Sequence, residues 1–196
     1  MLERIKIDTL ASRSSSTYTV RFLVWLDQCR PLPSTEPLMS VIKQDDLIQS
    51  IADALQFISY YHPTDFIRAM RGAWEKEESP AAKAALTQVL VNSRMCAIGK
   101  RPICQDTGIV NVLVSVGMDV QWDADMAFED MINEGVRRGY THPENVLRGS
   151  VLTDPNGARI NTKDNTPAIV HTKIVAGDTV EIEVAAKGGG SEAKAK

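Results

Sequence analysis

The sequence contains few cysteines, and their spacing excludes several kinds of site. Cys29, Cys96 and Cys104 are odd in number and form no Cys-x-x-Cys pair. Disulfide scaffolds and structural zinc sites depend on paired cysteines, so neither is expected here. Unpaired thiols fit a reducing compartment, and we expect a cytoplasmic protein.

Long hydrophobic runs and an excess of one charge are also missing. No apolar stretch approaches the roughly 20 residues that a membrane-spanning helix needs, so we expect no membrane partner. The formal net charge is −3, which gives no general attraction to nucleic acid. With 43% hydrophobic and 24% charged residues, the composition is that of an ordinary soluble globular protein.

Residues 1–38 differ from the rest of the chain. They contain a run of small polar residues, and Pro31, Pro33 and Pro37 disfavour regular structure. We expect a poorly ordered extension. Met39 is an alternative start of the chain, and in that case residues 1–38 follow from a mis-assigned start codon. A targeting peptide is the other interpretation, although acidic residues argue against the mitochondrial type.

After this extension the apolar residues follow a helical period. The first predicted helix carries an apolar stripe at three- and four-residue steps. In the second and third, Trp74 and Met95 are among the residues expected to face inward, and Cys96 is expected in the core. The helices are predicted at residues 44–58, 63–77, 80–99, 126–138 and 144–152.

Strands are predicted after the third helix. Residues 109–116 are rich in β-branched side chains, which indicates a buried strand. Residues 168–175 and 179–185 alternate in polarity around a short turn and predict a β-hairpin. Together these elements predict an α+β fold, in which N-terminal helices pack against a mixed β-sheet.

The segment Arg101–Gly108 concentrates reactive groups. Cys104, Gln105 and Asp106 put a thiol, a carboxamide and a carboxylate on consecutive residues. Gly108 permits a backbone turn that other residues resist, and the segment leads into the predicted strand. Taken alone, however, an isolated cysteine such as Cys104 is more often a small buried apolar residue than a ligand.

Three later segments make most sense as parts of the same pocket. Arg148 could bind an anion, although a solvated charge is the commoner role. The polar run 161–167 is either a surface loop or a pocket wall rich in donors. The glycines at 188–190 either offer backbone N–H groups to an anion or form a flexible linker. They match neither nucleotide-binding glycine motif, so a nucleotide loop is discounted.

Four motifs in this order resemble the class I fumarases, the oxygen-sensitive iron–sulfur fumarate hydratases, and the related α part of L-tartrate dehydratase. The motifs are Cys104–Gly108, Glu144–Arg148, Asn161–Pro167 and Lys187–Glu192. Each is weak alone, but four in register are specific. The resemblance implies that residues 39–196 are a partial N-terminal domain of a larger iron–sulfur hydro-lyase.

The resemblance also implies a role for five residues. Cys104 corresponds to the first of three cysteines that hold a [4Fe–4S] cluster. Gln105 and Asp106 correspond to substrate-binding residues, and Asp106 is the candidate acid/base. Arg148 corresponds to an arginine that clamps a substrate carboxylate, and Gly190 to a glycine whose backbone faces the substrate. The implied ligand is a small dicarboxylate, and the complete enzyme is expected to be a homodimer.

The family's other two cluster cysteines have no counterpart in Cys29 or Cys96, and the resemblance places them beyond Lys196. We therefore expect a fragment of a hydro-lyase that interconverts fumarate and (S)-malate, incomplete and inactive alone. A tartrate dehydratase-type hydro-lyase is the first alternative. A truncated product with no catalytic role is the second.

Overall fold

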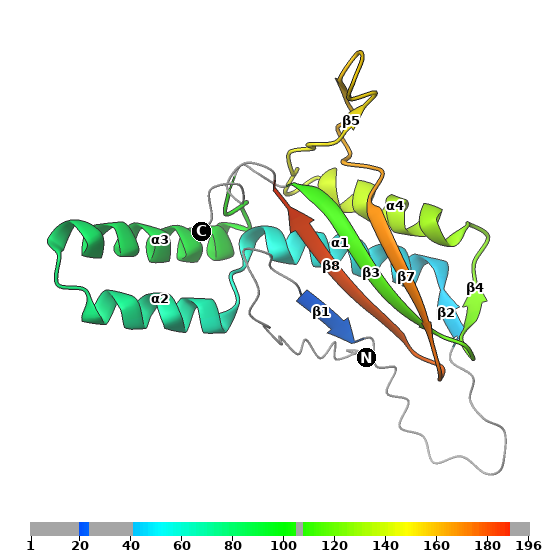
Figure 1. Cartoon of the computed structure of the whole chain (residues 1–196), viewed down its shortest axis with the longest axis horizontal. Coiled ribbons are helices and arrows are strands. Elements are labelled where there is room, and N and C mark those ends of the chain that lie inside the picture. The colour runs from blue at the N-terminus through cyan, green and yellow to red at the C-terminus, as the bar shows by residue number, and fades with distance from the viewer. Residues whose placement is uncertain (1–19, 24–40, 105–107, 189–196) are drawn as a thin grey trace, which may run out of the picture.

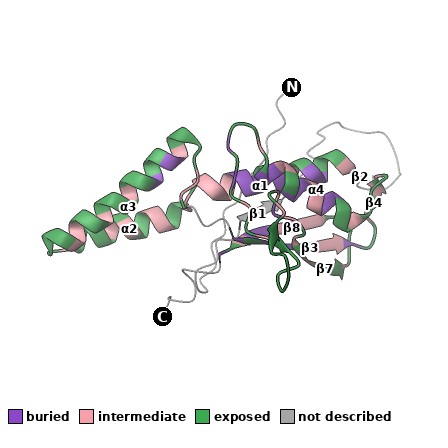
Figure 2. Cartoon of the chain, turned by 90° about the horizontal axis from the view of Figure 1, so that it is seen from above, coloured by how far each residue is buried: buried purple, intermediate pink, exposed green. Residues whose placement is uncertain are grey.

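The computed structural model describes residues 20–23, 41–104 and 108–188. A mixed β-sheet is covered on one face by two helices, and a helical hairpin projects to one side (Figures 1 and 2). The α+β fold predicted from the sequence is confirmed. The helices are α1 (Gln44–Tyr60), α2 (Thr64–Lys76), α3 (Pro80–Gly99) and α4 (Phe128–Tyr140). The strands are β1 (Val20–Leu23), β2 (Val41–Lys43), β3 (Ile109–Gly117), β4 (Gln121–Asp123), β5 (Leu152–Thr153), β6 (Ile160–Asn161), β7 (Ile169–Val175) and β8 (Val180–Lys187).

The main sheet has the strand order β1-β8-β3-β7. Strand β3 pairs in parallel with β7 and antiparallel with β8, so the sheet is mixed as expected. The predicted β7–β8 hairpin is wrong, because β3 lies between these strands (Figure 1). Strand β3 is apolar enough for the central position, where Val110, Val112 and Val114 are buried. The turn after β3 is also hydrogen-bonded to the turn that connects β7 with β8, since Asp119 N–H donates to Gly177 O (2.9 Å).

The core lies between this sheet and the helices α1 and α4. The predicted stripe on α1 is confirmed, with Ile48, Ile51 and Leu55 fully buried against α4 and the sheet. Helix α4 approaches α1 closely at Gly135, where a Cβ atom would lie 2.8 Å from Ile48 O. The two helices therefore pack backbone to backbone at this point.

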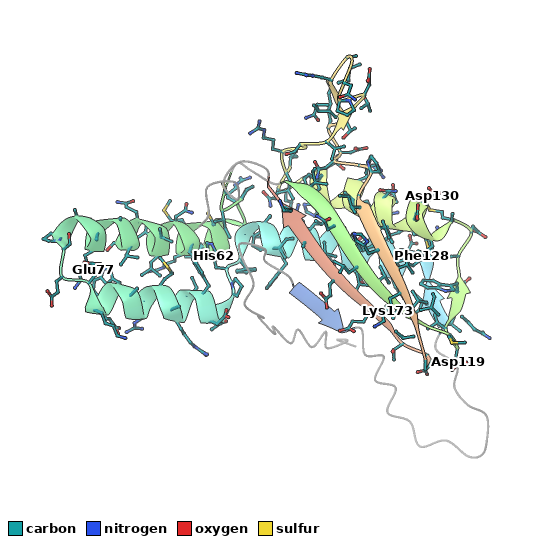
Figure 3. The ribbon with its side chains drawn as sticks, viewed as in Figure 1. His62, Glu77, Asp119, Phe128, Asp130 and Lys173 are labelled. Carbon is teal, nitrogen blue, oxygen red and sulfur yellow. The ribbon has the colours of Figure 1, made fainter. Side chains whose placement is uncertain are left out.

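The hairpin of α2 and α3 is packed less tightly than predicted. No residue of α2 is buried, and Trp74 is 36% exposed, with its indole N–H donating to Thr87 Oγ1 (2.8 Å). Met95 on α3 is 66% exposed, so its predicted inward position is wrong. The core position of Cys96 is confirmed. His62 lies where the hairpin leaves the body (Figure 3), and its Nδ1 is 3.0 Å from Ser93 Oγ.

The fourth helix begins later than predicted, at Phe128. The side chain of Gln44 bonds the segment before this helix, because its Oε1 accepts hydrogen bonds from the backbone N–H groups of Asp125 (3.1 Å) and Met126 (3.0 Å). The residues before them form β4, which pairs in parallel with β2. The ring of Phe128 (Figure 3) then packs edge-on against Trp122, 5.4 Å between centroids.

The predicted helix over 144–152 is absent, and this segment is irregular up to β5. Its polar groups are used in contacts with other elements. Leu147 N–H donates to Tyr140 O (3.0 Å), and Asn145 O accepts from Gln56 Nε2 (2.9 Å). These contacts replace the local hydrogen bonds that a helix would need.

Strand β1 is the one part of residues 1–38 that the structure describes. It pairs antiparallel with β8, from Val20 opposite Val184 to Leu23 opposite Glu181. The sequence did not predict this strand. The expected poor order of the remaining extension falls outside the described residues and stays a prediction. In the described part of the chain, no helix is both long enough and apolar enough to cross a membrane.

Candidate active site

The thiol of Cys104 lies on a short segment that leads from α3 to the start of β3. This segment is held from both sides, because Ile103 N–H donates to Ser59 O (2.8 Å) and Pro102 O accepts from Cys96 Sγ (3.6 Å). Cys104 is exposed and is in no disulfide. It is therefore not the buried apolar residue that an isolated cysteine usually is.

Gly108 closes the motif and lies directly against the glycine-rich segment after β8. Its φ of +67° is in the left-handed region, and a Cβ atom would lie 2.2 Å from Lys187 C and 2.5 Å from Gly188 N. The next residue, Ile109, pairs with Lys187 in the sheet. Only glycine satisfies both the backbone angle and this close approach.

Arg148 is exposed on the irregular segment after α4, but the residues on either side of it are fixed. Leu147 is 3% exposed. Gly149 O accepts a hydrogen bond from Asn161 Nδ2 (2.8 Å), which attaches the segment to the polar run 161–167. The guanidinium therefore belongs to a backbone that is anchored before and after it.

The polar run 161–167 contains a buried residue that sequence reasoning missed. Asn165 is fully buried, donates from Nδ2 to Gly108 O (2.9 Å), and accepts at Oδ1 from Ser150 N–H (2.6 Å). Its place within a polar run was the only signal in the sequence, and that run equally suggested a surface loop. Asn165 thus lies in the interior and holds Gly108, the last residue of the first motif, in place.

The structure brings together the segments of all four motifs at the corner where β3 begins and β8 ends (Figure 1). Cys104, Gly108 and the Arg148 segment are described there. Gln105, Asp106 and Gly190 lie outside the described residues, so their positions and roles stay predictions.

Charged side chains form ion pairs at the C-terminal end of α4, before the segment that leads to Arg148. Glu134 accepts from Arg137 Nε (2.6 Å) and Arg138 Nε (2.8 Å). The hydrogen bond from Arg137 is the main reason why the pKa of Glu134 is lowered to about 2. The pKa of Arg137 is raised, first by Glu134 and to a smaller extent by Asp164 of the polar run.

The thiols in the described part of the chain do not fit a complete four-iron cluster. Such a cluster needs several thiolate ligands. Within the described ranges, no three His, Cys, Asp or Glu side chains are grouped so that they could hold a metal ion. Cys104 is exposed and could act as one ligand, whereas Cys96 is buried and bonded to Pro102 O. Further thiolates would have to come from outside these residues.

Comparison with known proteins relates the chain to hydro-lyases. The family described as "Fumarate hydratase (Fumerase)" matches residues 48–196. A putative L(+)-tartrate dehydratase subunit alpha from Methanocaldococcus jannaschii is 29% identical over 147 residues, covering 72% of this chain and 50% of that protein. The anaerobic class I fumarate hydratase of Escherichia coli is 34% identical over 120 residues, covering 61% of this chain and 21% of that enzyme. The chain thus spans about half the length of the first relative and about a fifth of the second. On the strength of the match over 48–196, which includes all four motifs, the chain belongs to the fumarate hydratase (Fumerase) family.

Proposed function

We propose that this chain forms part of the active site of an iron–sulfur hydro-lyase that interconverts fumarate and (S)-malate. The observation that supports this most is the convergence of the Gly108 turn, the Arg148 segment and the glycine-rich end of β8 at one corner of the sheet. These segments are far apart in the sequence. Where they meet, the basic residue Arg148 lies on a segment next to the closely packed backbone of Gly108 and Lys187.

The charges at this corner suit a small dicarboxylate. Arg148 carries a planar guanidinium, which can bind a carboxylate through two hydrogen bonds. Lys163 contacts the Arg148 segment, since its carbonyl oxygen lies 3.0 Å from a Cβ built on Gly149, and Lys187 packs against Gly108. Both lysines make these contacts through backbone atoms, so Arg148 is the side chain that we propose for the carboxylate.

The remaining roles in the proposal rest on family membership. Gln105 would bind a substrate carboxylate, Asp106 would bind substrate and act as the acid/base, and the backbone of Gly190 would face the substrate. Cys104 would provide one thiolate to the [4Fe–4S] cluster. The two thiols that the structure describes, Cys96 and Cys104, cannot hold this cluster by themselves.

A hydro-lyase acting on tartrate is the second candidate. The relative named as a tartrate dehydratase subunit covers more of this chain, 72% against 61%, whereas the fumarate hydratase is more similar within its match, 34% against 29% identical. Malate and tartrate are four-carbon diacids that differ by one hydroxyl group, and fumarate is the dehydrated form of malate. The Arg148 contact proposed here would serve either.

We expect Arg148→Ala to weaken fumarate binding by at least about tenfold, because one charge-assisted contact is lost. NMR titration of the whole chain with fumarate, L-tartrate and acetate would measure this and rank the two diacids. Arg71→Ala is the matched control, since Arg71 is exposed on α2 and pairs with Glu75 on the same helix. An equal loss in both variants would contradict the role of Arg148. No binding of either diacid would favour a product without a catalytic role.

We also expect no hydratase turnover from the 196-residue chain alone. Of its three cysteines, only Cys104 lies in one of the four motifs, and one thiolate cannot hold a four-iron cluster. The measurement is malate formation from fumarate after anaerobic incubation with iron and sulfide. The E. coli relative under the same conditions is the positive control. Turnover above the background of iron and sulfide would show that the chain is complete enough for catalysis.

A further inference from the structure

Asn165 makes hydrogen bonds to two segments that are distant in the sequence. Its Oδ1 accepts from the N–H groups of Ser150 (2.6 Å) and Val151 (3.2 Å), and its Nδ2 donates to Gly108 O (2.9 Å). The side chain is fully buried. Both lone pairs of its oxygen are therefore used on one segment, while its amide group holds the other.

Asn161 Nδ2 also joins the run to the Arg148 segment, at Gly149 O (2.8 Å), but it does not reach Gly108, and other polar side chains of the region bond locally. Asp154 Oδ2 accepts from Ala158 N–H (3.0 Å), and Asp164 Oδ1 accepts from Thr166 N–H (3.1 Å). Such short-range bonds only shape the loop that contains them. The partners of Asn165 are 14, 15 and 57 residues away, so its bonds determine how separate segments lie relative to each other.

We propose that Asn165 is the positioning residue that sets the Arg148 segment against the Gly108 turn, so that both face the same diacid. The inference rests on the proposed function, because it assigns Asn165 a purpose at the substrate site. Arg148 is only two residues from Ser150, which Asn165 holds by its backbone N–H. A shift of this segment would move the guanidinium relative to Gly108, and misplacement by about 1 Å can cost on the order of 100-fold in an active site.

The substitution Asn165→Asp separates the two sides of this bridge. The φ of Asn165 is +63°, and aspartate tolerates this left-handed conformation about as well as asparagine. A carboxylate still accepts from Ser150 and Val151, but it has no proton to donate to Gly108 O. The variant therefore removes the contact with the motif and keeps the contact with the Arg148 segment.

The test is performed on the whole chain with fumarate as the probe. We expect Asn165→Asp to leave amide hydrogen exchange at Ser150 and Val151 unchanged, while fumarate affinity falls by at least about tenfold. A residue needed only for loop stability would instead alter exchange and affinity together. The control is Asn133→Asp, which introduces the same charge and keeps its own bond, because Asn133 Oδ1 accepts from Ala168 N–H (2.9 Å).

A second variant covers the case in which the aspartate does not fold. Asn165→Gly removes all three bonds without backbone strain, so affinity alone is its readout, and we expect fumarate binding to weaken by at least about tenfold. Unchanged affinity in a folded variant, while the wild type binds, would overturn the inference and leave the proposed function intact. So would failure of both variants to fold while Asn133→Asp folds. No fumarate binding by the wild type would overturn the proposed function itself, and the inference with it.

Discussion

Replacing Gly108 by alanine is expected to lower the free energy of unfolding by roughly 3 kcal/mol or more. The left-handed φ of +67° disfavours any residue with a Cβ, and the new methyl group would lie 2.2 Å from Lys187 C and 2.3 Å from Lys187 O. Backbone atoms in a paired strand cannot move aside as a side chain can. The β8 end, the motif turn or both would have to shift.

Urea unfolding followed by circular dichroism would measure this change. Gly72→Ala is the matched control, because Gly72 lies within α2 and no atom lies within 4 Å of a Cβ built there. The control should gain about 1 kcal/mol from the higher helix propensity of alanine. If the midpoint of unfolding of both variants lay at the same urea concentration as that of the wild type, or at a higher one, the close packing of Gly108 would be refuted.

The parts of the fold that follow from the sequence are those in which one face of an element is buried. The stripe of Ile48, Ile51 and Leu55 predicted α1, and the β-branched run beginning at Ile109 predicted β3. In both, the spacing of apolar residues reports directly on a core contact. Element boundaries were less accurate, since the helix predicted from Met126 begins at Phe128.

The errors have a common physical cause. Periodicity describes what a segment prefers locally, whereas strand order and buried polar contacts depend on distant partners. The alternation around Gly177 suggested a hairpin, but β3 was the better neighbour for both strands. The polar run around Asn165 was predicted to be either a surface loop or a pocket wall, and its local pattern could not decide, because its partner Gly108 lies 57 residues away. The motifs indicated which segments meet, but not which side chain holds them together.

Gln56 provides the second large effect expected, again because a buried polar side chain connects distant segments. Its Nε2 donates to Gly139 O (2.6 Å) and Asn145 O (2.9 Å), and its Oε1 accepts from Asn145 Nδ2 (2.9 Å). Gln56→Ala should lower the free energy of unfolding by roughly 3 kcal/mol, because unpaired buried polar groups remain and a cavity forms.

The control is another glutamine on the same helix, two turns earlier. Gln49 is exposed and its Nε2 donates to Asp53 Oδ1 (2.8 Å) on the same helix, so Gln49→Ala should change stability by less than about 0.5 kcal/mol. Equal effects in the two urea titrations would show that the buried bonds add nothing.

Gln56→Glu is more selective, since its carboxylate still accepts from Asn145 Nδ2 but donates to neither carbonyl. Because Asn145 lies three residues before Arg148, this variant should also weaken fumarate binding. Loss of stability without loss of binding would mean that the Arg148 segment is held from the Asn165 side alone.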